Sequence, residues 1–322
     1  MPKKAKTKKP VEMDEKSANP GDRMKHALSL EVLSRTADWP TVTYSETHAG
    51  AGIYAESKQK PANAHIRALR ERVMWELVRS AAGATAVERP TPVPGAAYLD
   101  LLKRWWDSPD QFGNYPGSAR QAGDYLASQR RQFQLLLTEC DLATCNRLKV
   151  AVKGFPSQVE KDSFEPKLEW LTAPDHLYLV VDPFRCVESF TGHVNLPDGK
   201  FGVAEGDIDH GIVHKVLRLC SDRSAAVMHF WWPTTSQDGK SGVSAIVADS
   251  NKTTRGLFLT WESEKPGRCY RQYDDYHNHA SALLGVGKGA DIVRQVGKLA
   301  WDKSWLSPFL RLTGDTPEEE VA

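Results

Sequence analysis

The chain has 322 residues and a mass of 35.9 kDa, and 40% of its residues are apolar and 26% charged. This is enough to bury the core of one large domain or two ordinary ones, and it excludes a disordered chain. No segment approaches the ~20 apolar residues that a membrane-spanning helix requires, and the N-terminus lacks the apolar run of a signal peptide. We therefore expect a cytoplasmic protein with no membrane association.

The formal net charge of +1 conceals an uneven distribution. The first nine residues contain five lysines and no acid, so the rest of the chain carries a net charge of −4. We interpret residues 1–20 as a disordered basic arm, which is either a solubilising tail or a nonspecific contact for nucleic-acid phosphates. The five cysteines are an odd number without a CxxC pair, which favours free thiols over a structural zinc site.

The first predicted elements are a helix ending near Arg35, a short strand over 42–46 and a glycine turn over 48–52. Apolar residues then recur at helical spacing from position 66 to position 77. The arginines of this second helix form either a solvated face or an RNA-facing surface; they are Arg67, Arg70, Arg72 and Arg79. A third helix is expected over 98–106, and residues 55–112 therefore indicate a helical insertion subdomain.

Strand and helix patterns alternate through the rest of the chain. Strands are predicted at 134–138, 177–181, 225–232, 256–261 and 281–286, and the continuous apolar run at 177–181 is typical of a buried parallel strand. This alternation predicts an α/β domain with a mostly parallel sheet, formed by residues 21–54 and 113–322.

Ligands of open parallel sheets bind beyond the carboxyl ends of the strands. The first predicted strand ends in the glycine turn, and later ones end near Glu139, Asp162 and Asp182. Glycines allow a ligand to approach the backbone closely, a carboxylate such as Glu139 can accept hydrogen bonds from both ribose hydroxyls, and a third-strand Asp can accept one from an adenine amino group. Together these positions predict a site for a nucleoside ligand such as S-adenosylmethionine.

Several short motifs resemble, in order and rough spacing, those of the RlmJ family. That family comprises 23S ribosomal RNA adenine-N6 methyltransferases that depend on S-adenosylmethionine. The motifs are Lys25-His26, THAGAGIY at 47–54, YPGS at 115–118, LTE at 137–139, VEKD at 159–162, VVDP at 180–183 and FWWP at 230–233. The similarity covers roughly residues 20–310.

The resemblance implies a Rossmann-like class I methyltransferase sheet and a cofactor site. Within that site Glu139 would bind the ribose and Asp162 the adenine, while His26, His48 and Ser118 would line the methionine end. Two positions have simpler interpretations: His48 as a turn histidine, and Ser118 as a helix N-cap. The full implied cofactor-binding set is Lys25, His26, His48, Gly50, Gly52, Ser118, Glu139, Asp162 and Asp182.

The implied catalytic residues are Asp182, Pro183 and Phe184, which stand where the family has Asp-Pro-Pro-Tyr. Asp182 and the Pro183 carbonyl would accept hydrogen bonds from the target amino group, and the aromatic ring would stack on the flipped base. Here Phe184 lies one residue early, and Arg185 occupies the tyrosine position. The substrate half of the site therefore departs from the family more than the cofactor half.

These observations predict an enzyme that methylates N6 of an adenine in ribosomal RNA, and we expect a monomer. The altered motif leaves two alternatives: a noncatalytic cofactor- or RNA-binding protein on the same scaffold, and a methyltransferase for another kind of substrate. Residues 273–279 hold two acids and two histidines without a third ligand at a telling spacing, so we interpret them as a polar surface or substrate loop and predict no metal.

Overall fold

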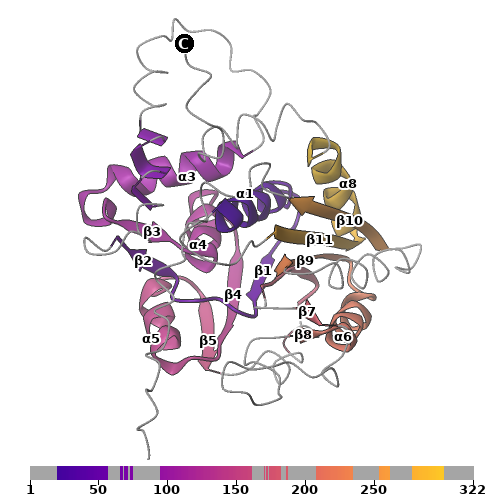
Figure 1. Cartoon of the computed structure of the whole chain (residues 1–322). Coiled ribbons are helices and arrows are strands. Elements are labelled where there is room, and N and C mark those ends of the chain that lie inside the picture. The colour runs from indigo at the N-terminus through magenta and orange to yellow at the C-terminus, as the bar shows by residue number, and fades with distance from the viewer. Residues whose placement is uncertain are drawn as a thin grey trace, which may run out of the picture.

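The computed structural model (Figure 1) describes the chain in several ranges. Those ranges are residues 20–56, 66–67, 69–71, 73–74, 95–161, 170, 172, 174–182, 186–187, 208–234, 254–261 and 278–300. Residues 1–19 of the predicted arm lie outside the described residues, and its last residue, Pro20, begins the first helix. Of the predicted polar loop, 273–277 lie outside them, whereas Asn278 and His279 are in a strand. Three of the predicted site residues, Asp162, Pro183 and Phe184, also lie outside them.

A seven-stranded sheet organises the fold. In spatial order its strands are β10 (Thr254–Trp261), β11 (Asn278–Gly287), β9 (Ala225–Thr234), β6 (His176–Val181), β1 (Val42–Glu46), β4 (Phe133–Glu139) and β5 (Ser157–Lys161). The five strands from β9 to β5 are parallel. β11 pairs antiparallel with both β9 and β10, so it alone among these seven runs against the others. This arrangement confirms the predicted α/β class and the mostly parallel sheet.

Helices connect and cover the strands. They are α1 (Pro20–Ser34), α3 (Ala96–Asp107), α4 (Ser118–Ser128), α5 (Leu142–Ala151), α6 (His210–Cys220), α8 (Lys288–Ala300) and the short 3-10 helix η3 (Pro109–Gln111). Two small sheets pair β2 (Ile53–Ala55) with β3 (Asn114–Pro116), and β7 (Cys186–Val187) with β8 (Ile208–Asp209). α1 packs against α3, α4 and α8, and this cluster of helices is visible in Figure 1.

The central strand β1 is buried along its whole length, because neighbours flank it on both edges and helices cover the sheet. Its Val42 and Tyr44 belong to the same apolar core as residues of α1, α3 and α4. The edge strand β5, in contrast, is largely exposed. The close packing of α8 on β9 requires a glycine, because a Cβ on Gly289 would lie 1.9 Å from the Ala226 carbonyl oxygen.

The sequence patterns located these elements well. The apolar positions Ile66, Leu69 and Val73 are helical and buried, as predicted. The helix α3 buries Trp105 and Trp106, whose indole N–H groups both donate to the Asn114 carbonyl. The arginine face is mixed: Arg70 is buried in an ion pair with Glu56, and Arg67, which pairs with the same carboxylate, is half exposed.

Candidate active site

Three carboxylates lie at the carboxyl ends of adjacent parallel strands. Glu46 is the last residue of β1, Glu139 is the last residue of β4, and Asp182 directly follows β6. The chain fills the sheet from β1 towards β5 and then returns to the other side of β1 with β6, so the strand order reverses between β1 and β6. Ligands of doubly wound sheets bind at such a switch point. The site predicted from the strand ends therefore lies where the topology favours ligand binding.

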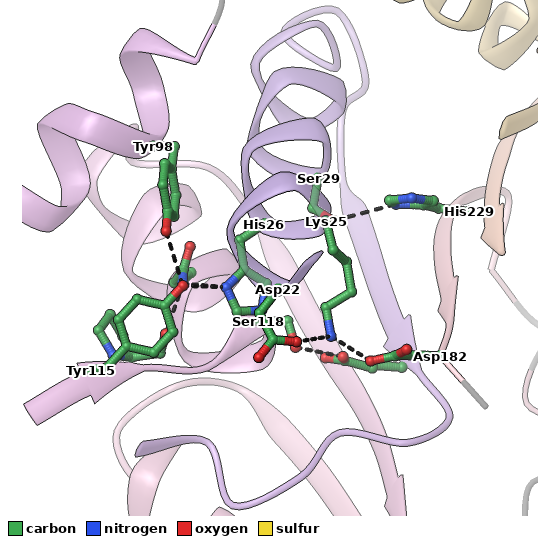
Figure 2. A network of polar contacts seen from close by, with 12 residues as sticks. Asp22, Lys25, His26, Ser29, Tyr98, Tyr115, Ser118, Asp182 and His229 are labelled. Carbon is green, nitrogen blue, oxygen red and sulfur yellow. Dashed lines mark hydrogen bonds and ion pairs between the residues drawn. The ribbon is translucent and has the colours of Figure 1, made fainter. Parts of the chain in front are cut away.

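A buried lysine of α1 contacts the carboxylate that follows β6. The ammonium of Lys25 donates a hydrogen bond to the carboxylate of Asp182 and lies 3.7 Å from a carboxylate oxygen of Asp22 (Figure 2). Burial alone would lower the pKa of Lys25. The negative charges of Asp182, Asp22 and Glu46 outweigh burial and raise this pKa above its ordinary value. Lys25 is therefore a permanent cation in the site, and the Asp182 side chain remains 22% exposed.

Glu46 is the most buried carboxylate of the group, with 1% exposure. The hydroxyl of Ser118 donates to one of its oxygens, and the hydroxyl of Tyr44 donates to the other at 2.9 Å. Burial raises the pKa of Glu46 to about 7, although the charge of Lys25 and the hydrogen bond from Ser118 oppose that rise. Ser118 is the first residue of α4 and its hydroxyl points to Glu46, so it does not cap the helix.

The raised pKa of Glu46 predicts a pH-dependent stability. Between about 4.5 and 7 the folded state binds a proton that the unfolded state has released, so Glu46 lowers the free energy of unfolding as pH rises through this window. A shift of this size corresponds to roughly 3 kcal/mol. The free energy of unfolding of wild type minus that of Glu46→Gln should therefore fall as pH rises from 5 to 7, which denaturant unfolding at pH 5, 6, 7 and 8 would measure. Two buried histidines with lowered pKa values, His26 and His229, act in the opposite direction in both proteins and cancel in this difference. Asp291→Asn, in an exposed pair with Arg294, should keep the wild-type profile; a wild-type slope in Glu46→Gln would contradict the assignment.

His26, next to Lys25 on α1, lies in a second buried network (Figure 2). Its Nδ1 is 2.7 Å from the Tyr115 hydroxyl and 2.9 Å from the Gln121 amide nitrogen. The Tyr115 hydroxyl is 2.9 Å from that of Tyr98. Burial, followed by the charge of Lys25, lowers the pKa of His26 well below its ordinary value. His26 is therefore a neutral imidazole.

A second buried histidine, His229 on β9, lies on the other side of α1 (Figure 2). Its Nδ1 contacts the Tyr178 hydroxyl at 3.1 Å and the Ser29 hydroxyl at 3.4 Å. Burial, together with the charge of Lys25, lowers the pKa of His229 to about 3. Its ring therefore contributes no positive charge to the site at neutral pH.

Glu139 holds the glycine turn that follows β1. One carboxylate oxygen accepts the Gly50 N–H and the other accepts the Asp141 N–H, each at 3.0 Å. Gly50 and Gly52 have φ angles of +61° and +72°, which only glycine adopts readily. Side chains at these positions would also meet the Tyr54 hydroxyl and Ala151. The turn therefore requires its glycines for its own packing, independently of any ligand.

The structure gathers the predicted residues into two neighbouring groups. Lys25, Asp182, Ser118 and His26 lie around Glu46 and Tyr115, and Gly50 lies on Glu139. His48 is half-buried in the turn, with its Nδ1 2.6 Å from the Thr47 hydroxyl. Sequence reasoning missed the buried polar residues that support these groups. They are Tyr44, Glu46, Tyr98 and Gln121.

Within the described ranges, no three His, Cys, Asp or Glu side chains come together as metal ligands would. Among the helices of those same ranges, none combines the length and the apolar character needed to cross a bilayer.

Among known proteins, the similarity found for this chain is to solved structures. No protein-family model matches the chain, and a search of curated proteins finds no match. A protein from Legionella pneumophila str. Philadelphia 1, described with the family model DUF519, superposes with a TM-score of 0.58 at 17% identity, covering 89% of this chain and 92% of that one. A METTL16 methyltransferase domain gives a TM-score of 0.37 at 10% identity, covering 83% and 68%. An rRNA methylase from Streptococcus thermophilus gives 0.37 at 6% identity, covering 83% and 97%.

The fold class follows from the sheet and from the superposition over nearly the whole of both chains. Six strands run in one direction, and the antiparallel β11 lies between the last two of them, β9 and β10; this is the Rossmann-like sheet of class I methyltransferases. This confirms the predicted fold. The similarity at 17% identity is a similarity of fold, so the activity has to be argued from the residues of the site.

Proposed function

We propose that this protein is an S-adenosylmethionine-dependent methyltransferase that acts on nucleic acid, with N6 of a ribosomal RNA adenine as the target. The observation that carries the proposal is the placement of Asp182 beyond β6 at the switch point, paired with Lys25, while Glu139 ends the neighbouring strand β4. An acceptor for a target amine and an acceptor for a ribose thus lie at the same edge of the sheet.

The donors and acceptors present fit this cofactor. Oε2 of Glu139 accepts one backbone N–H and retains a lone pair for a ribose hydroxyl, whereas Oε1 accepts the Asp141 N–H and a weak contact from the Cys140 thiol, which a second ribose hydroxyl would displace. His26 is a neutral ring beside Lys25. His48 lies in the glycine turn, and Ser118 is the first residue of α4. These three side chains would line the methionine end, and Asp162 is proposed for the adenine.

The bound cofactor would supply an electrophilic methyl group. The protein has to orient the target amine, exclude water and stabilise the positive charge that develops on the nitrogen. The Asp182 carboxylate can accept an N–H hydrogen bond from the amine and offset that charge. Lys25 fixes the direction of this carboxylate through their ion pair. The excess proton then leaves the methylated nitrogen for Asp182 and solvent.

The nucleic-acid assignment depends on the resemblance at 182–184 and on the lysine arm. Pro183 is proposed to provide a second acceptor for the amine, and Phe184 to stack on the flipped base, an interaction worth ~1–3 kcal/mol. The body of the protein has no net positive charge, so the arm would supply nonspecific attraction to phosphates.

Titration calorimetry with S-adenosylmethionine tests the cofactor site. We expect wild type to bind and Glu139→Ala to bind roughly 100-fold more weakly, because two charge-assisted hydrogen bonds to the ribose are lost. Asp124→Ala, which removes a surface pair with Arg120, is the matched control and should bind like wild type. A thermal melt of each variant separates lost binding from unfolding.

Absence of binding by the folded wild type would contradict the proposal. Binding without enzyme-dependent transfer of methyl groups to RNA would instead favour a noncatalytic binding protein. The substitution of the family's Asp-Pro-Pro-Tyr by residues 182–185 is the observation that keeps this alternative open.

A further inference from the structure

The amide of Gln121 has a fixed orientation. Its nitrogen lies 2.7 Å from the Pro116 carbonyl oxygen, an acceptor, so this end of the amide must be the donating NH2 group. The same nitrogen lies 2.9 Å from Nδ1 of His26. The reversed amide would place its oxygen against the Pro116 oxygen, which is repulsive. The second N–H of Gln121 therefore points at His26.

This orientation determines the tautomer of His26. A hydrogen on Nδ1 would face the N–H of Gln121, so Nδ1 must be the acceptor and the ring hydrogen must be on Nε2. The Tyr115 hydroxyl, 2.7 Å from Nδ1, can donate or accept, and so can that of Tyr98, so the tyrosines adapt to either tautomer and the Gln121 amide is the group that sets it. His26 and Tyr115 also stack, with ring centroids 5.7 Å apart, which fixes the plane of the imidazole.

We propose that Gln121 is a positioning residue that holds His26 as a neutral imidazole with its hydrogen on Nε2, ready to donate to a ligand acceptor. The hydrogen bonds of Gln121 and His26 are present in the structure whatever the ligand is. The identity of the ligand acceptor, the carboxylate at the methionine end, rests on the proposed function.

The neutral state of the donor matters in this site. Lys25 already places one buried positive charge beside His26, and a sulfonium ligand would add another. An imidazolium would therefore repel both. Locking Nδ1 as an acceptor gives the site a hydrogen-bond donor at Nε2 without a further charge.

The Gln121 side chain lowers the stability of the fold in a way that an apolar side chain at this position would avoid. It is 1% exposed, and its Oε1 has no hydrogen-bond partner in the described part of the structure. A buried acceptor without a donor is unfavourable, so an apolar side chain would suit this position on α4 better if packing were its purpose. This loss of stability is consistent with selection for the amide nitrogen as a hydrogen-bond donor to His26.

Nitrogen-15 NMR of the histidine rings tests the proposal directly, because it distinguishes the two tautomers and the imidazolium. His26→Gln assigns the resonances. In wild type we expect an unprotonated Nδ1 and a protonated Nε2. Gln121→Met, which removes both donors, should yield a mixture of tautomers and weaken S-adenosylmethionine binding about tenfold. Gln121→Glu, which offers only acceptors, should move a hydrogen onto Nδ1.

Gln129→Met, at the exposed end of the same helix, is the matched control and should change neither the tautomer nor the affinity. A wild-type ring with its hydrogen on Nδ1, or Gln121 variants with an unchanged tautomer, would overturn the proposal. The wild-type spectrum decides this even if a variant fails to fold. If wild type shows the expected tautomer and its loss in the variants but binds no S-adenosylmethionine, the role of Gln121 stands and the proposed function fails.

Discussion

Asp182→Asn is expected to slow methyl transfer to RNA by roughly 10³-fold, the usual effect of removing a group that stabilises charge in a transition state. Asparagine keeps the size of the side chain and can still accept a hydrogen bond from Lys25, so the fold should persist. It lacks the negative charge that would offset the positive charge on the methylated nitrogen. The effect should therefore fall on the chemical step more than on cofactor affinity.

Single-turnover transfer of a radiolabelled methyl group from S-adenosylmethionine to RNA measures this rate, and calorimetry measures the affinity in parallel. Asp124→Asn provides the matched control, because it changes an Asp to Asn in a surface pair with Arg120. A rate within a few-fold of wild type for Asp182→Asn would show that another group contacts the amine. Equal losses in rate and in cofactor affinity would point to a binding role instead.

The elements of the fold could be predicted because their signals are local. The continuous apolar run before Asp182 and the glycine turn after β1 are read within a few residues, and both are found where predicted. The strand-end rule predicts that Glu139 and Asp182 lie at one edge of the sheet, and the structure has them there. Sequence order was sufficient here because parallel strands align their carboxyl ends.

The supporting network could not be predicted, because its partners meet only in three dimensions. Gln121 and His26 are 95 residues apart, and Lys25 and Asp182 are 157 residues apart. Glu46 occupied the end of a strand like any other polar residue, and nothing local showed that Tyr44 and Ser118 would both donate to it. Tyr98 lies on α3, and the packing of α3 on α1 brings it to the site.

The ion pair between Lys25 and Asp182 should also matter for stability. Lys25→Met keeps an unbranched chain of similar length but leaves the carboxylates of Asp182 and Glu46 without their cation. Breaking a buried pair by removing one partner typically costs 3–5 kcal/mol, and because Asp182 is 22% exposed we expect the lower end, about 3 kcal/mol. Denaturant unfolding at pH 7.5, where Glu46 is mostly ionised, measures the loss.

A double-mutant cycle isolates the pair itself. In Lys25→Met combined with Asp182→Asn the uncompensated carboxylate is gone, so the double variant should be more stable than Lys25→Met and recover about half of the loss. The remainder reflects Asp22 and Glu46, which still lack the Lys25 charge; without that charge the pKa of Glu46 rises further, so this carboxyl folds with a bound proton. Lys288→Met, in an exposed pair with Asp38, should change stability by less than about 0.5 kcal/mol. Additive losses in the cycle would show that Lys25 and Asp182 stabilise the fold independently, and the ion pair would then have no part in holding the proposed acceptor in place.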